Sequence, residues 1–224
     1  MSPRAGAGSG SSGPPSPAAL VDELAALLGE GARHEARFIV EEVLGSGSGG
    51  ARPAFVPADA VERARGMAAR RAAGEPLQYV FGHWPFRHID LLLDARVLIP
   101  RPETEQVVEV ALGEARRLLE VRSGAGLIAV DAGTGSGAIA LALATELADG
   151  MAQVWATDVS SDALEVAAAN VLACGPAEVT LARGSWLTPL PERLRGRIDL
   201  VVSNPPYVSA EEWAGLDPEV RAEP

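Results

Sequence analysis

The stretch Leu127-Ile-Ala-Val-Asp-Ala-Gly-Thr-Gly-Ser-Gly137 decides the fold of this chain. It begins as a short apolar run, which is typical of a buried strand, and continues as a glycine-rich turn. An apolar helix is predicted over 138–147. Without a Cβ, the glycine backbone can approach a ligand closely, and the start of the helix presents free N–H groups. The stretch therefore predicts a strand, turn and helix that bind a ligand.

Further strands and helices alternate after this unit. The runs 152–157, 179–182 and 198–202 are predicted to be strands, and 161–173 a helix with Ser160 or Ser161 as its N-cap. Such alternation is typical of an α/β fold, a Rossmann-like parallel sheet with helices on both faces. Ligands of these sheets bind at the C-terminal ends of the strands. We expect 198–202 to be buried on both faces.

The N-terminal half is predicted to be helical. Ser16-Pro17 has the pattern of an N-cap followed by the first helical residue, and apolar residues favour helices over 17–28, 33–44 and 58–73. These helices predict a small domain over 16–75, preceded by a disordered Gly/Ser/Pro tail over 1–15. Short β-rich runs at 78–81, 84–86, 89–93 and 97–99 predict a β-hairpin linker over 76–100.

Composition excludes several classes of protein. The formal net charge of −11 argues against a protein that mainly grips nucleic-acid phosphates. A single cysteine excludes an internal disulfide and a cysteine-built zinc site, and the three histidines lack metal-ligand spacing. The chain contains neither a secretory signal nor an apolar run of about 18 residues that could span a membrane. We expect a cytoplasmic monomer without a metal, a membrane anchor or sequence-specific nucleic-acid contacts.

The glycine-rich turn favours one cofactor. Its spacing is G-x-G-x-G, whereas dinucleotide sites have G-x-G-x-x-G. Asp131 precedes the glycines and suits a cofactor that carries a cation. Asp158, at the end of the next strand, can accept hydrogen bonds from both hydroxyls of a ribose. Together these features favour S-adenosyl-L-methionine.

A second motif, Asn204-Pro-Pro-Tyr207, ends the last predicted strand. Two prolines cannot continue a strand ladder, because neither has an N–H and both have a fixed φ. The resulting stiff loop presents a side-chain amide, backbone carbonyls and an aromatic ring, which can hold a planar NH2 group. The plainer interpretation is a rigid loop that only ends the strand.

With both motifs, the sequence resembles the amino-methyltransferases of the class I fold that use S-adenosyl-L-methionine. More narrowly, it resembles the protein-(glutamine-N5) methyltransferases that modify peptide chain release factors. This resemblance rests on five stretches: Gly74–Tyr79, Leu98–Glu105, Asp131–Gly137, Asn204–Tyr207 and Asp217–Pro224. It implies a methyltransferase domain over 101–224 and a substrate glutamine in the Gly-Gly-Gln loop of release factors. From its position in the chain, we expect the N-terminal helical domain to recognise the substrate.

The resemblance also implies roles for single residues. Asp158 takes the ribose and Trp186 lies beside the adenine, where Ser185 stands in place of the Asp found in many relatives. Asn204, Pro205 and Tyr207 carry the catalysis. The cofactor's methionine side contacts Gly133, Thr134, Gly135, Ser136 and Gly137, with Asn204 nearby, and the substrate amide contacts Asn204, Pro205, Pro206 and Tyr207. Glu103 and Glu105 either cap a helix that begins at Pro102 or line a ligand pocket.

Two alternatives stay open. The same loop could hold the NH2 group of adenine in a nucleic acid, which would require base flipping. The chain could also be an inactive fragment that binds the cofactor, because the fold usually has seven strands and four are recognisable. We expect a chain that is truncated relative to its family, with 198–202 at or near a sheet edge, and less stable and active than a complete one.

Overall fold

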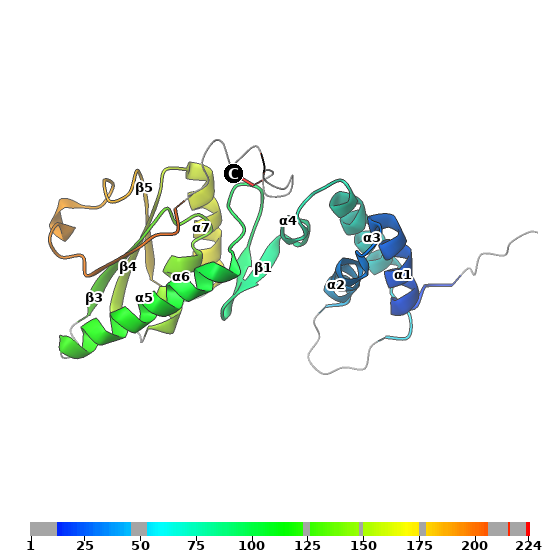
Figure 1. The fold of residues 1–224 in the computed structure, drawn as a ribbon, viewed down its shortest axis with the longest axis horizontal. Coiled ribbons are helices and arrows are strands. Elements are labelled where there is room, and N and C mark those ends of the chain that lie inside the picture. The colour runs from blue at the N-terminus through cyan, green and yellow to red at the C-terminus, as the bar shows by residue number, and fades with distance from the viewer. Residues whose placement is uncertain are drawn as a thin grey trace, which may run out of the picture. The chain divides into compact units, whose positions relative to one another are not determined.

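A computed structural model describes residues 13–45, 53–122, 126–147, 150–174, 178–205, 215 and 223–224 of the chain. It divides into two compact units, Met1–Val80 and Phe81–Pro224 (Figure 1). Most of the predicted tail, residues 1–12, lies outside the described residues. No helix of the described ranges is long and apolar enough to cross a membrane.

Helices α1 (Pro17–Leu28), α2 (Arg33–Leu44) and α3 (Ala58–Ala72) form the N-terminal unit, which confirms the predicted helices. Ser16 caps α1 as predicted, because its hydroxyl accepts the N–H of Ala19 at 3.2 Å. Leu20 and Leu24 of α1 are fully buried, whereas Leu27, expected on the same face, is half exposed. The three helices bury their apolar faces against one another.

The arginines of α3 hold this unit together. Arg71 pairs with Glu35 of α2 at 2.7 Å, and both side chains are largely buried. Arg70 donates to the carbonyl oxygens of Tyr79 and Val80 and pairs with Glu75. These contacts position the segment that follows α3.

The run 78–81 was predicted to be β-rich, and this prediction is wrong. Residues Leu77–Phe81 form helix α4. The carbonyl oxygen of Pro76 accepts the N–H groups of Tyr79 and Val80, both at 3.0 Å, which closes a helical turn. Burial of Leu77, Tyr79 and Val80 then outweighs the β-propensity of these side chains.

One β-hairpin follows, as predicted. Strands β1 (His83–Phe86) and β2 (Ile89–Leu92) pair antiparallel, with His83 opposite Leu92 and Phe86 opposite Ile89. The run 97–99 was also expected to be extended in a strand, but it pairs with none of the described strands. The N–H of Ile99 instead donates to the carboxylate of Glu223 at 3.1 Å.

The second unit is built on a parallel sheet of the order β5-β4-β3-β6. Its strands are β3 (Leu127–Ala132), β4 (Ala152–Asp158), β5 (Val179–Arg183) and β6 (Leu200–Val202). Its helices are α5 (Pro102–Val121), α6 (Ala138–Glu146) and α7 (Ser161–Ala173). The chain moves outward from β3 to β5 and then returns to β6 on the other side of β3. The switch point of the sheet therefore lies between β3 and β6.

The two faces of the sheet are covered differently. Helices α5, α6 and α7 pack on the strands and lie on one side of the sheet, opposite the β5–β6 connection, in Figure 1. Ile128 and Val130 of β3 face the other side, where they pack with Leu190 and Leu194 of the β5–β6 connection. We predicted helices on both faces, but the described part of this connection contains only the 3-10 turn Glu192–Leu194. Pro189 and Pro191 interrupt it, because proline lacks the N–H that a helix requires.

Strand β6 is an edge strand among the described residues, as the sequence predicted. The expectation that it is buried on both faces is wrong, since Val201 is 50% exposed. Only Leu200, Val201 and Val202 of the predicted 198–202 strand pair with β3.

Candidate functional site

The C-terminal ends of β3, β4 and β6 bring the predicted site residues together. Ala132 at the end of β3 stands beside Thr157 of β4, and Asp131 stands beside Val202 of β6. The hydroxyl of Ser203 donates to the carbonyl oxygen of Ala132 at 2.6 Å. This bond fixes the chain between β6 and Asn204 directly beside the start of the glycine-rich turn.

The glycine-rich turn keeps an open space in front of it. Gly133 and Gly135 have φ values of +77° and +55°, and a Cβ added to either would meet no atom within 4 Å. Gly137 has a different role, because a Cβ there would lie 3.4 Å from the Cβ of Ala167 in α7. Thr134 and Ser136 are buried, so their side chains support the turn from behind. Gly133 and Gly135 are therefore the residues whose backbone can meet a ligand.

Asp131 holds the turn from inside the protein. One oxygen, Oδ2, accepts the hydroxyl of Thr134 at 2.5 Å and the N–H of Ala140 at 3.1 Å. The other, Oδ1, is buried without a hydrogen-bond partner among the described residues. Burial raises the pKa of Asp131 to about 6, despite the two hydrogen bonds that favour its ionised form.

Asp158 and Trp186 lie at the end of β4. The carboxylate of Asp158 accepts the N–H of Gly135 and that of Ser160, both at 2.9 Å. Each oxygen keeps a further lone pair, so hydroxyls of a ribose can still be accepted. The backbone oxygen of Trp186 accepts the hydroxyl of Thr157 at 2.8 Å, and the Trp186 side chain is 58% exposed. An exposed ring beside the strand end can form one wall of an adenine pocket.

Asn204 is oriented by a residue from a distant part of the sequence. Its Nδ2 donates to the hydroxyl oxygen of Thr104 in α5 at 3.1 Å. Thr104 is buried, and its own N–H donates to the carbonyl oxygen of Arg101 at 2.9 Å. The Oδ1 of Asn204 takes no part in the bond to Thr104 and can accept a hydrogen bond. Pro205 is exposed, and the predicted site residues Pro206 and Tyr207 lie outside the described residues.

The chain is anchored on each side of Thr104. Buried Glu223 accepts the N–H of Ile99 and forms an ion pair with Arg101 at 2.5 Å. Glu105, which the sequence left open as a cap or a pocket residue, accepts the backbone N–H of Arg87 at 3.0 Å. Its carboxylate therefore joins α5 to the β1–β2 hairpin.

Sequence reasoning missed two residues, Thr104 and Asn170. Thr104 is part of the quoted Leu98–Glu105 stretch but received no role. Asn170 is a fully buried polar residue within an alanine-rich helix. A polar side chain on the apolar face of a helix was the signal that could have identified it, since buried amides require partners.

These features fit S-adenosyl-L-methionine. The open space before Gly133 and Gly135 accommodates a ligand, and the carboxylate of Asp158 and the Trp186 ring suit its nucleoside. Among the described residues no group of three or more His, Cys, Asp or Glu side chains could hold a metal ion.

The fold and these strand ends define a class I methyltransferase domain, and residues 129–221 match the family model described as "Methyltransferase domain". Residues 19–82 match the model described as "PrmC N-terminal domain". A release factor glutamine methyltransferase of Bordetella pertussis is 41% identical over 205 residues, which cover 86% of this chain and 68% of that protein. This chain belongs to the family of release factor glutamine methyltransferases.

A second relative of the same name, from Agrobacterium fabrum, is 41% identical over 74% of this chain and 55% of its own length. The chain thus spans about half to two thirds of the length of these relatives. The N-terminal domain of human METTL16 in complex with SAH is 17% identical, with a TM-score of 0.39 over 68% of this chain and 55% of that chain. The assignment rests on the sequence relatives.

Proposed function

We propose that this chain transfers a methyl group from S-adenosyl-L-methionine to the side-chain N5 of a protein glutamine, that of the Gly-Gly-Gln loop of peptide chain release factors. It would do so as a cytoplasmic monomer, without sequence-specific nucleic-acid contacts. One observation carries the proposal. In a member of this family, Asn204 stands at the switch point beside the glycine-rich turn, with its amide oriented by Thr104.

The acceptor side of the reaction follows from the chemistry of an amide. An amide nitrogen is a poor nucleophile, because its lone pair is delocalised into the carbonyl group. If Oδ1 of Asn204 and the carbonyl oxygen of Pro205 each accept one N–H, the lone pair is directed at a methyl donor. Such positioning can supply roughly 7–11 kcal/mol of the barrier. The same acceptors stabilise positive charge that develops on the nitrogen.

The donor side uses the glycine-rich turn. Gly133 and Gly135 would hold the methionine part of the cofactor, Asp158 its ribose and Trp186 its adenine. When bound, the cofactor supplies a methyl group on a positively charged sulfur. Ser185 is exposed beside Trp186 and could accept a hydrogen bond from the adenine NH2. Tyr207 would cover the flat face of the substrate amide.

The proposal is tested by mass spectrometry of a release factor incubated with the chain and S-adenosyl-L-methionine. We expect one added methyl group on the glutamine of the Gly-Gly-Gln loop, and its loss with Asn204→Ala. Tryptophan fluorescence verifies folding of the variant, because Trp84, Trp155 and Trp186 belong to the unit Phe81–Pro224 and residues 1–80 contain no tryptophan. Full methylation by a folded Asn204→Ala protein would contradict the mechanism. Methylation of adenine in a nucleic acid would contradict the substrate.

Recognition of the release factor is assigned to the N-terminal helical domain. A hollow of about 640 Å³ lies between α1 and α2, with Val21, Val40 and Leu44 among its apolar lining residues. We expect Val21→Asp to raise the KM for the release factor and to leave the Kd for S-adenosylhomocysteine unchanged. Phe55→Asp is the matched control, because Phe55 is an exposed apolar residue of the same unit outside this hollow. Equal KM values for both variants would contradict this role.

A further inference from the structure

Both polar atoms of the Asn170 side chain, in α7, form hydrogen bonds that join two parts of the second unit. Its Oδ1 accepts the N–H of Leu92 at 2.7 Å, and its Nδ2 donates to the carbonyl oxygen of Leu92 at 3.0 Å. The same Nδ2 donates its second hydrogen to the carbonyl oxygen of Ser136 at 2.9 Å. Asn170 is fully buried, so water cannot replace these bonds. Strand β2 and the glycine-rich turn are thus hydrogen-bonded to one side chain.

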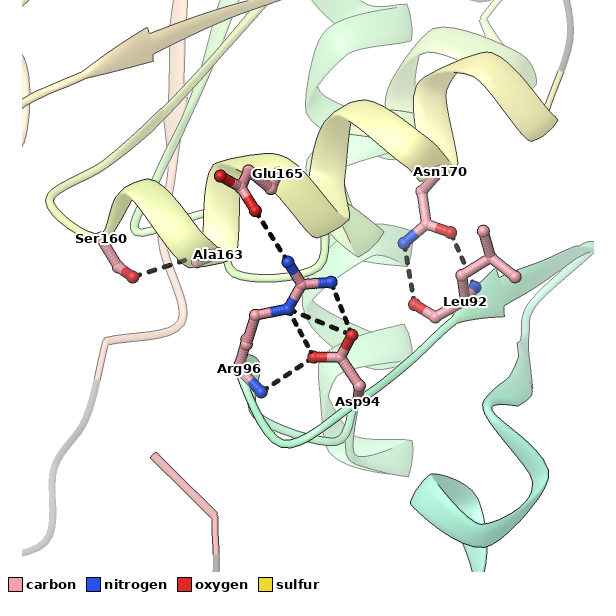
Figure 2. A network of polar contacts seen from close by, with 7 residues as sticks. All are labelled: Leu92, Asp94, Arg96, Ser160, Ala163, Glu165 and Asn170. Carbon is pink, nitrogen blue, oxygen red and sulfur yellow. Dashed lines mark hydrogen bonds and ion pairs between the residues drawn. The ribbon is translucent and has the colours of Figure 1, made fainter.

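A second contact beside Asn170 is of a different kind. Figure 2 shows Arg96 between Asp94, which follows β2, and Glu165 of α7. Arg96 pairs with Asp94 at 2.7 Å and with Glu165 at 2.9 Å. These side chains are 42–69% exposed, so their ion pairs add little to stability. They belong to the same interface but do not reach the glycine-rich turn, which makes them a natural control.

The segment that Asn170 holds leads to the other half of the candidate site. From Leu92 the chain passes through Ile99 and Arg101, both anchored by Glu223, to Thr104. Thr104 in turn accepts the amide hydrogen of Asn204. Asn170 therefore contacts the glycine-rich turn, which is assigned to the cofactor. It also contacts Leu92, where the segment begins that leads to Thr104 and orients the amide of Asn204, which is assigned to the substrate.

We propose that Asn170 is a positioning residue for methyl transfer, which fixes the glycine-rich turn relative to the segment between Leu92 and Thr104. This inference rests on the proposed function. Asn170 itself contacts neither reactant. It acts through the carbonyl of Ser136 on the donor side and through the backbone of Leu92 on the acceptor side. Loss of either bond would let the two sides shift against each other.

Asn170→Asp tests this role with almost no change in volume. The new carboxylate can still accept the N–H of Leu92, but it cannot donate to the carbonyl oxygens of Leu92 and Ser136. We expect kcat for glutamine methylation to fall roughly 10- to 100-fold, as small misplacements of reacting groups do, with the KM for the release factor unchanged. Glu165→Gln, the control at the same interface, should leave kcat within about twofold.

Asn170→Ser is measured in parallel, because a buried carboxylate can prevent folding. Both variants are assayed at a temperature at which tryptophan fluorescence shows a folded unit. A purely structural residue would lower the unfolding midpoint and leave kcat per folded molecule unchanged. Unchanged kcat in a folded Asn170→Ser protein would therefore overturn the inference.

A measurement on the unaltered chain separates this inference from the proposed function. S-adenosylhomocysteine, which is not itself a methyl donor, should slow hydrogen exchange at the Leu92 amide if the turn and β2 are coupled. Slowed exchange in a chain that leaves the release factor unmethylated would support the coupling and contradict the proposed function. Methylation with a Leu92 exchange rate that S-adenosylhomocysteine does not change would overturn the coupling and support the proposed function.

Discussion

Gly133→Ala separates the ligand-binding role of the glycine-rich turn from its conformational role. Gly133 has a φ of +77°, and an added Cβ would point into open space. A left-handed conformation costs an alanine about 1–2 kcal/mol, and a less flexible unfolded chain offsets about 0.4–1 kcal/mol. We therefore expect a loss of about 1 kcal/mol in the unfolding free energy.

Gly150→Ala is the matched control. Gly150 has a φ of +74°, its added Cβ would also meet no atom within 4 Å, and it precedes β4 at the opposite end of the sheet. Both variants should lose about the same stability, since the backbone cost is the same. Only Gly133→Ala places a methyl group where the cofactor is expected. Its affinity for S-adenosylhomocysteine should fall about tenfold or more, which corresponds to at least about 1.4 kcal/mol.

The assay combines urea unfolding, followed by tryptophan fluorescence, with calorimetric titration of S-adenosylhomocysteine. Residues 1–80 contain no tryptophan, so the fluorescence reports on the sheet-containing unit. Equal binding by the two variants would refute the assignment of the turn to the cofactor. A much larger loss of stability in Gly133→Ala than in Gly150→Ala would refute the backbone argument.

Three further predictions concern side chains of the site. Because burial raises the pKa of Asp131 from 3.8 to about 6, the unfolded chain releases this proton at a lower pH than the folded chain does. As the pH rises from about 4 to about 6, the contribution of Asp131 to the unfolding free energy therefore falls by about 3 kcal/mol. Urea unfolding of Asp131→Asn at these pH values should not show this fall. Thr104→Val should lower kcat roughly tenfold in the methylation assay, because the hydrogen bond to Asn204 is lost. Thr104→Ser keeps the hydroxyl and should keep the kcat of the unaltered chain. Glu223→Gln should lower the unfolding free energy by about 1 kcal/mol in urea, since Arg101 is partly exposed.

The elements that carry their own boundary signals could be predicted from the sequence. Ser16 and Pro17 marked the start of α1, because a cap acts within a single turn of helix. The glycine-rich turn indicated both the strand that precedes it and the helix that follows it. These signals are local, so a sequence displays them without knowledge of the fold.

The contacts that organise the site could not be predicted in this way. Asn204 and its partner Thr104 are 100 residues apart, and Asn170 and Leu92 are 78 residues apart. Helix α4 was missed for a related reason, because burial of its side chains outweighed their local propensity. In each case the deciding partner came from another part of the folded chain.

The two halves of the candidate site differ in how firmly the sheet supports them. Gly133 follows β3, which has a neighbouring strand on each side, whereas Asn204 follows β6, which is an edge strand of three residues within the part of the chain that the structure describes. Segments with fewer packed neighbours yield at a lower energetic cost. Among the described residues, the turn proposed to hold the methyl donor is therefore the half of the site that the sheet supports more firmly, and the loop proposed to hold the acceptor amide is the more easily displaced half.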